Sequence, residues 1–100
     1  MFNDIDFSKM GQMLQNAKEK MESFENDAAK REFTAKSGGG LISVSINGSF
    51  EIIDITIADE LFEDKQSLQI LLISAVNDAI KLAYEDKKNA AAAMFNLGGF

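Results

Sequence analysis

The chain contains no cysteine and no histidine among its 100 residues. Without cysteine it has no disulfide, no thiolate nucleophile and no cysteine-ligated zinc or iron–sulfur centre. Without histidine it lacks the usual general base near neutral pH, the common zinc ligand, and any Ser–His or Cys–His nucleophile system. No acid–base constellation stands out in their place. We therefore expect a protein that is not an enzyme and needs no cofactor.

Long hydrophobic runs are also missing. No stretch approaches the ~18–20 apolar residues of a membrane-spanning helix, and nothing resembles a signal peptide. We expect a cytoplasmic protein with no membrane partner and no small-molecule substrate. A chain of 100 residues forms one domain, 1–100. It buries only about 60–65% of its unfolded surface, so association with a second copy would add to a modest core.

Basic residues are in the minority. There are 10 Lys and Arg against 16 Asp and Glu, which gives a net charge of −6. This balance argues against tight binding to nucleic acid, which needs a basic surface. Such binding would require the basic side chains to gather on one face, away from the acids.

A long helix is predicted over about residues 9–30, after a loose arm formed by 1–7. Asp6 or Ser8 could cap it, no proline interrupts it, and Gly11 is its weak position. Its apolar residues follow a heptad. The stripe either covers the sheet of the same chain or contacts a second copy or a partner surface. This seam consists of Phe7, Met10, Leu14, Ala17, Met21 and Phe24.

Three short segments alternate apolar and polar residues, which predicts three strands of an antiparallel meander. Gly38-Gly39-Gly40 predicts a turn, not a phosphate-binding loop, because a strand follows it instead of a helix. Asn47-Gly48 favours a two-residue type I′ hairpin turn. The predicted strands are 32–36, 41–46 and 49–57.

An acidic connector, 58–65, joins the last strand to a second long helix over about 66–89. Its acids match no calcium-loop spacing, so we expect no metal site and assign Asp64 as the helix N-cap. The second helix has a wide apolar face, suited to be the main cover of the sheet. Residues 94–100 read as a flexible tail with apolar side chains. The predicted fold class is α+β: long N-terminal helix, three-stranded antiparallel meander, long C-terminal helix.

Three motifs in this order resemble the YbaB/EbfC family of small bacterial nucleoid-associated proteins. The first runs from Ser37 to Gly48, with Gly40, Leu41, Val44 and Ile46 in matching places. The others are the connector Leu61-Phe62-Glu63-Asp64 and the helix motif Asn77-Asp78-Ala79. The likeness covers about residues 8–100.

The resemblance implies a homodimer in which the sheets of two subunits associate and long helices project like the arms of a tweezer. It also implies binding to double-stranded DNA with little sequence preference, with a role in nucleoid organisation and gene regulation. Family positions that are basic here are Lys20, Lys81 and Lys88. Further basic residues of the two helices, which complete the candidate DNA-binding set, are Lys18, Lys30, Arg31 and Lys87.

Two alternatives stay open. Each of these basic side chains could simply belong to a solvated helix face. The protein could also be a protein–protein adaptor or scaffold that uses the first-helix seam and the tail residues Met94, Phe95 and Phe100. Single-strand recognition by base stacking is not expected, because Tyr84 stands alone and the Phe residues follow apolar patterns.

Overall fold

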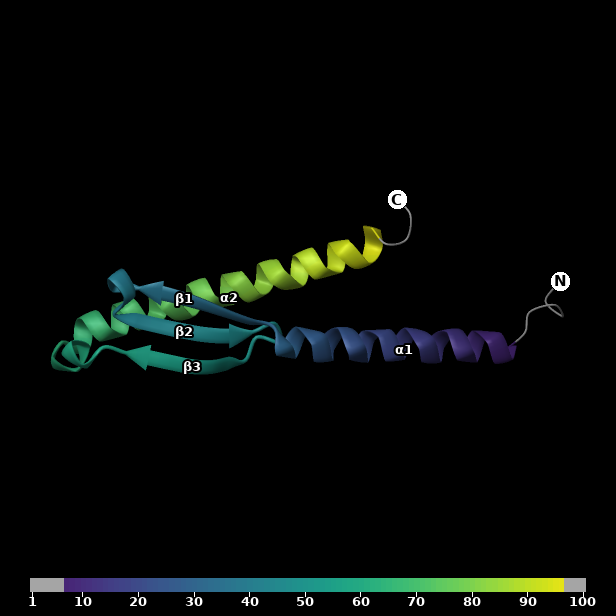
Figure 1. The fold of residues 1–100 in the computed structure, drawn as a ribbon, viewed down its shortest axis with the longest axis horizontal. Helices are drawn as coiled ribbons and strands as arrows, with labels where there is room; N and C mark the ends of the chain where they lie inside the picture. The colour runs from purple at the N-terminus through teal and green to yellow at the C-terminus, as the bar shows by residue number, and fades with distance from the viewer. Residues whose placement is uncertain (1–6, 97–100) are drawn as a thin grey trace.

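The computed structural model describes residues 7–96, and it has the expected α+β architecture (Figure 1). The chain extends over 73 × 24 × 18 Å. A three-stranded sheet lies at one end, and the two long helices run from it towards the other end (Figure 1). The elements are α1 (Phe7–Lys30), β1 (Glu32–Ser37), η2 (Gly38–Gly40), β2 (Ile42–Asn47), β3 (Ile52–Ile57), η3 (Asp59–Glu63) and α2 (Lys65–Asn96).

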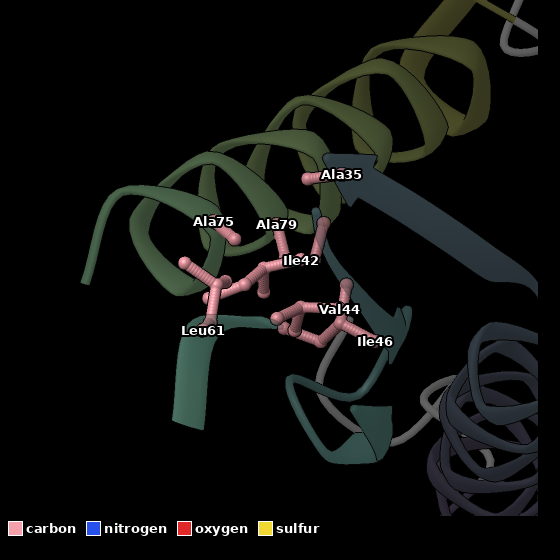
Figure 2. Close-up of a cluster of buried hydrophobic side chains, with 8 residues drawn as sticks. Ala35, Ile42, Val44, Ile46, Leu61, Ala75 and Ala79 are labelled. Carbon is pink, nitrogen blue, oxygen red and sulfur yellow. The ribbon is translucent and has the colours of Figure 1, made fainter. Parts of the chain in front are cut away.

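The sheet is an antiparallel meander with β2 in the centre. Ala35 of β1 pairs with Val44 of β2, which pairs in turn with Ile55 of β3. Directly paired residues share one face of a sheet, so these three side chains lie on the same side. On that side α2 contacts β1 and β2 (Figure 2).

Small side chains let α2 approach the sheet closely. The alanines at 75, 79 and 83 are spaced by four residues, lie on one helix face and are fully buried. They pack against Ile42, Val44 and Ile46 of β2, which are fully buried as well (Figure 2). The prediction that this helix covers the sheet is therefore confirmed, although Ile80, expected on the same face, remains 42% exposed.

The triple-glycine segment is a turn that also docks on α2. All three glycines have positive φ, a region that only glycine enters without steric cost. Ser37 Oγ donates a hydrogen bond of 2.6 Å to the backbone carbonyl of Leu71. A side chain at Gly38 would place its Cβ 2.6 Å from Leu71 Cδ1. The segment thus fixes the β1–β2 connection against the helix.

The predicted two-residue turn at Asn47-Gly48 is wrong. The hairpin loop is longer, and its residue with left-handed backbone is Phe50, at φ 64°, not Gly48. Asn47 organises the loop: its Oδ1 accepts hydrogen bonds from the N–H groups of Ser49 and Glu51. Gly48 is needed for a different reason, because a Cβ there would lie 2.5 Å from the carbonyl oxygen of Ala28.

An irregularity in the β2–β3 pairing changes which side chains of β3 share a face. The register shifts between Ser45 and Ile46, so Ile52 pairs with Ile46 while Asp54 pairs with Ser45. Strict alternation would place Ile52 on the same face as Asp54 and Thr56; the bulge places it beside Ile55 instead. Both remain 42% exposed, because α2 does not extend over β3.

Within residues 7–96, the first helix is attached to the body only near its C-terminal end. Among its residues only Ala28 is buried, and its main contact with the rest of the chain is with β2. It projects beyond the sheet and reaches further than the end of α2 (Figure 1). The alternative in which its apolar stripe covers the sheet of the same chain is therefore wrong.

Two helix boundaries also differ from expectation. The first helix already includes Phe7, which was expected in the loose arm. The second continues to Asn96, so 94–96, expected as the start of a flexible tail, are helical. The run of four alanines at 90–93 explains this, because alanine has the highest helix propensity. The rest of the expected arm, 1–6, and of the tail, 97–100, lies outside the described residues.

Candidate nucleic-acid interface

Two lysines of α2 form the best-aligned basic pair. Lys81 and Lys88 are seven residues apart, which places them on one helix face about 10 Å from each other. Both are exposed. The distance between successive phosphates of one DNA strand is only a few ångströms shorter than the distance between these two lysines. Their flexible side chains could therefore contact two phosphates at once. Lys87 lies about 100° around the helix from Lys88, and its Nζ sits 5.5 Å from the centre of the Phe50 ring.

The candidate lysines of α1, namely Lys18, Lys20 and Lys30, are exposed but are spread around the helix. Lys18 and Lys20 are two residues apart, which separates them by about 200° around the helix axis. Lys30 lies in the last turn, where a positive charge is favourable to the helix dipole. All three side chains are open to solvent. Lys18 and Lys20 therefore cannot both face a single DNA surface.

Arg31 has an internal partner. Its Nε donates to both carboxylate oxygens of Asp86 at 3.0 Å, and its Nη2 lies 3.0 Å from Oδ2. The two side chains are 37% and 18% exposed. Because its charge is matched within the chain, we expect Arg31 to contribute less to phosphate binding than the exposed lysines do.

A cavity of about 610 Å³ lies where α1 and α2 separate. Met21 and Phe24 of α1, and Ala91 and Met94 of α2, give it a mainly apolar wall. The β2–β3 loop closes one side with Phe50. Two residues of the α1 seam, Met21 and Phe24, thus line this cavity.

The outer part of the seam, from Phe7 to Ala17, has no cover among residues 7–96. Phe7 is 76% exposed, Leu14 71% and Met10 48%, and Ala17 is exposed too. Together with Ile52 and Ile55 on β3, these side chains form two uncovered apolar surfaces on a small protein. Apolar surfaces of this kind mark sites of protein–protein contact.

One acid of the connector, Asp64, has a clear structural role. Asp64 Oδ2 accepts a hydrogen bond of 2.6 Å from Ser67 Oγ, and Oδ1 accepts one of 3.1 Å from the Ser67 N–H. These bonds, first the side-chain one, lower the pKa of Asp64 below its ordinary 3.8. Asp64 thus acts as the N-cap of α2, as predicted. No acidic cluster suited to a metal ion is found within 7–96, and no helix of that range is long and apolar enough to cross a membrane.

Sequence patterns did not reveal three structural roles. Asp86 lies 55 residues from Arg31, and no periodicity connects them. The sequence predicts Phe50 in a strand, yet it lies in the β2–β3 loop, where its ring contacts the ammonium group of Lys87. Gly48 reads as a turn residue, whereas it is required by the close approach of α1.

This architecture is that of a small binding module, in which two lysine-bearing helices extend from a compact sheet. The chain belongs to the YbaB/EbfC DNA-binding family, whose sequence profile matches residues 2–99. The family is defined by DNA binding and not by a reaction.

Individual relatives agree with this assignment. The chain is 65% identical to a nucleoid-associated protein of Campylobacter fetus, over 100% of this chain and 98% of that one. It is 55% identical to one of Campylobacter lari, over 96% and 95% of the two chains. The crystal structure of an uncharacterized protein from Helicobacter pylori matches with a TM-score of 0.81 at 43% identity, covering 91% of this chain and 98% of that one.

Proposed function

We propose that the protein is a homodimer that binds duplex DNA, mainly through phosphate contacts and with little sequence preference. Membership of a DNA-binding family carries this proposal. Its exposed lysines on two projecting helices agree with it, since phosphate contacts need only flexible cations at the right spacing. Its relatives are called nucleoid-associated proteins, which supports a location in the nucleoid of a bacterial cytoplasm. A role in nucleoid organisation and gene regulation is part of the same proposal.

Electrostatics limits the strength of this binding. A dimer carries twenty basic residues, twice the 10 of one chain, but its net charge is −12, twice −6. Long-range repulsion by the acids therefore opposes attraction by the lysine faces. We expect weak to moderate affinity that falls steeply as salt is added, because binding releases counterions from the DNA.

The uncovered apolar surfaces support the dimer. The β3 strip, Ile52 and Ile55, borders the open edge of the sheet, where another strand can pair. The α1 seam has the narrow heptad pattern typical of helix–helix contact. Covering both would bury the side chains that one chain leaves in water.

Salt titration of binding to unrelated duplexes tests the DNA contact. We expect log K to fall linearly with log salt, at similar slopes for different sequences. Lys81→Ala and Lys20→Ala should each make the slope shallower by about one unit for every copy of that lysine that contacts a phosphate, hence by about one to two units in the dimer. Lys65→Ala is the matched control, because Lys65 begins α2 at the end far from the projecting arms. No binding at about 50 mM salt would contradict the proposal.

Sedimentation at micromolar concentration tests the dimer. The wild-type protein should sediment at twice the 11.0 kDa of one chain. Ile55→Lys and Leu14→Lys should weaken the dimer about 100-fold or more, because each would bury an unpaired charge. Thr56→Lys adds the same charge on the other face of β3 and should leave the dimer intact. A wild-type species of 11.0 kDa would refute the dimer.

The exposed seam also favours a second candidate function, a protein–protein adaptor. In this case Phe7 and Leu14 would bind another protein instead of a second copy. The two functions separate cleanly. The adaptor function predicts that the protein does not bind DNA even at low salt. It also predicts that Leu14→Lys abolishes binding to the partner protein and leaves self-association unchanged.

A further inference from the structure

The Arg31–Asp86 pair stands at the point where α1 leaves the body. Arg31 directly follows the last residue of α1, and Asp86 lies well inside α2. The Nε–H is shared between both carboxylate oxygens, and Nη2 approaches Oδ2, all at 3.0 Å, so the ion pair gives the guanidinium a defined orientation. The ion pair thus connects the C-terminal end of α1 to the side of α2.

Few other interactions hold α1 in its direction. The Gly48 N–H donates to the carbonyl oxygens of Ala28 and Arg31, both at 3.0 Å. The helix is otherwise exposed from Phe7 to Asp27, with Phe24 partly buried against the cavity. Backbone bonds at a single loop permit rotation about that loop, whereas a side-chain contact to α2 restricts it.

A small rotation at this base has a large effect at the tip. From Ala28 to Phe7 the helix runs about 30 Å, so a turn of about 10° moves its tip by about 5 Å. Lysines on α1 and α2 can neutralise phosphates of one duplex only when the arms are spaced to suit it. Their relative direction is therefore part of the binding geometry.

We propose that Arg31 and Asp86 form an ionic clamp that sets the angle between α1 and α2, and that through this angle they position the DNA-binding lysines without contacting DNA themselves. This inference rests on the proposed DNA binding for its effect on affinity, but the angle can be measured without DNA. Arg31 is accordingly a positioning residue. It differs in role from Lys20, Lys81 and Lys88.

Neutralising Asp86 separates the clamp from simple electrostatics. Asp86→Asn removes one negative charge, so electrostatics alone predicts equal or tighter binding to DNA. The clamp predicts the opposite, a loss of about fivefold in affinity, because a part-exposed ion pair is removed and the arms spread over more angles. Glu85→Gln is the matched control: the neighbouring side chain is exposed, and the same charge is removed.

Distances between spin labels give the second readout. The chain has no cysteine of its own, so Gln12→Cys on α1 and Asn89→Cys on α2 can be labelled selectively. The labelled protein is equilibrated with an excess of unlabelled protein, so that distances within one chain dominate. Asp86→Asn should broaden the distance distribution, Glu85→Gln should not, and Arg31→Asp with Asp86→Arg should narrow it again.

The outcomes decide the proposal. The clamp is overturned if Asp86→Asn has the same distance distribution as the wild-type protein. It is also overturned if Asp86→Asn binds DNA as tightly as Glu85→Gln does. Should the wild-type protein bind no DNA, the proposed function fails, and the distances alone decide whether the clamp exists. Circular dichroism checks folding. Arg31→Lys keeps the charge but loses the Nε–H that both oxygens of Asp86 share, and it replaces Asp86→Asn where that variant does not fold.

Discussion

The two long helices of this protein are both amphipathic, but they differ in how much of their apolar surface is buried within the chain. The first has the narrower and more regular apolar stripe, yet only Ala28 of it is buried. The second presents small alanines to the sheet, and its larger side chains Ile70, Ile73 and Ile80 stay between 42% and 60% exposed. The alanines let α2 approach the sheet, and larger α2 side chains such as Leu71 and Val76 pack around the same core. An apolar stripe therefore indicates that a helix has a partner, but it does not show whether that partner is the chain's own sheet.

The largest effect should come from the alanine contact of α2. Ala79→Glu places a carboxylate at a fully buried position against β2 and should lower the free energy of unfolding by about 3–5 kcal/mol. Ala29→Glu on the exposed part of α1 should change it by less than about 0.5 kcal/mol. Urea unfolding followed by circular dichroism measures both. Equal losses would contradict the contrast between the helices.

An intermediate effect should come from the attachment point of α1. Gly48→Ala would place a Cβ 2.5 Å from the Ala28 carbonyl oxygen and should destabilise the fold by about 1–3 kcal/mol.

Gly11→Ala makes the matched comparison. A Cβ at Gly11 meets nothing within 4 Å, and alanine favours a helix, so this change should stabilise α1 by about 0.5–1 kcal/mol. Thermal unfolding should show the two variants moving in opposite directions. A loss of stability in both would mean that α1 packs against the chain along its length.

The smallest effect concerns the N-terminus of α2. The lowered pKa of Asp64, caused by its bonds to Ser67, means that the ionised form is preferred in the folded protein. Its contribution is therefore present above the ordinary pKa of 3.8 and is lost as the pH falls through the lowered value. Asp64→Asn should lose stability near neutral pH and little in strong acid. A difference from wild type that stays constant with pH would contradict this role.

The sequence predicts the elements of this fold well because each has a local cause. The glycines at 38–40 demand a turn, the alternation from Ile42 to Ile46 demands a strand, and Asp64 caps a helix. Where the predictions failed, distant parts of the chain determined the outcome. Gly48 is fixed by α1 from outside its own hairpin, and the bulge that moves Ile52 depends on the pairing of two strands.

The candidate site was predictable only in part. Composition and the family motifs single out the lysines, and the structure shows Lys81 and Lys88 on one exposed face. The pairing of Arg31 with Asp86 could not be read from the sequence, because the partners are 55 residues apart and each looks like an ordinary surface charge. An ion pair of this kind appears only once the base of α1 has been placed against α2.

The attachment of α1 at one end also determines how it responds to solvent. Residues 7–23 of α1 are all exposed, so tertiary packing adds little to their stability, and helices that rely on their own hydrogen bonds are marginally stable in water. Within one chain, the first turns of α1 should therefore fray, and their amide protons should exchange through local opening. Those of β2 should exchange only when the whole domain unfolds. The arm that reaches furthest is thus also the part of the molecule whose order depends most on what it touches.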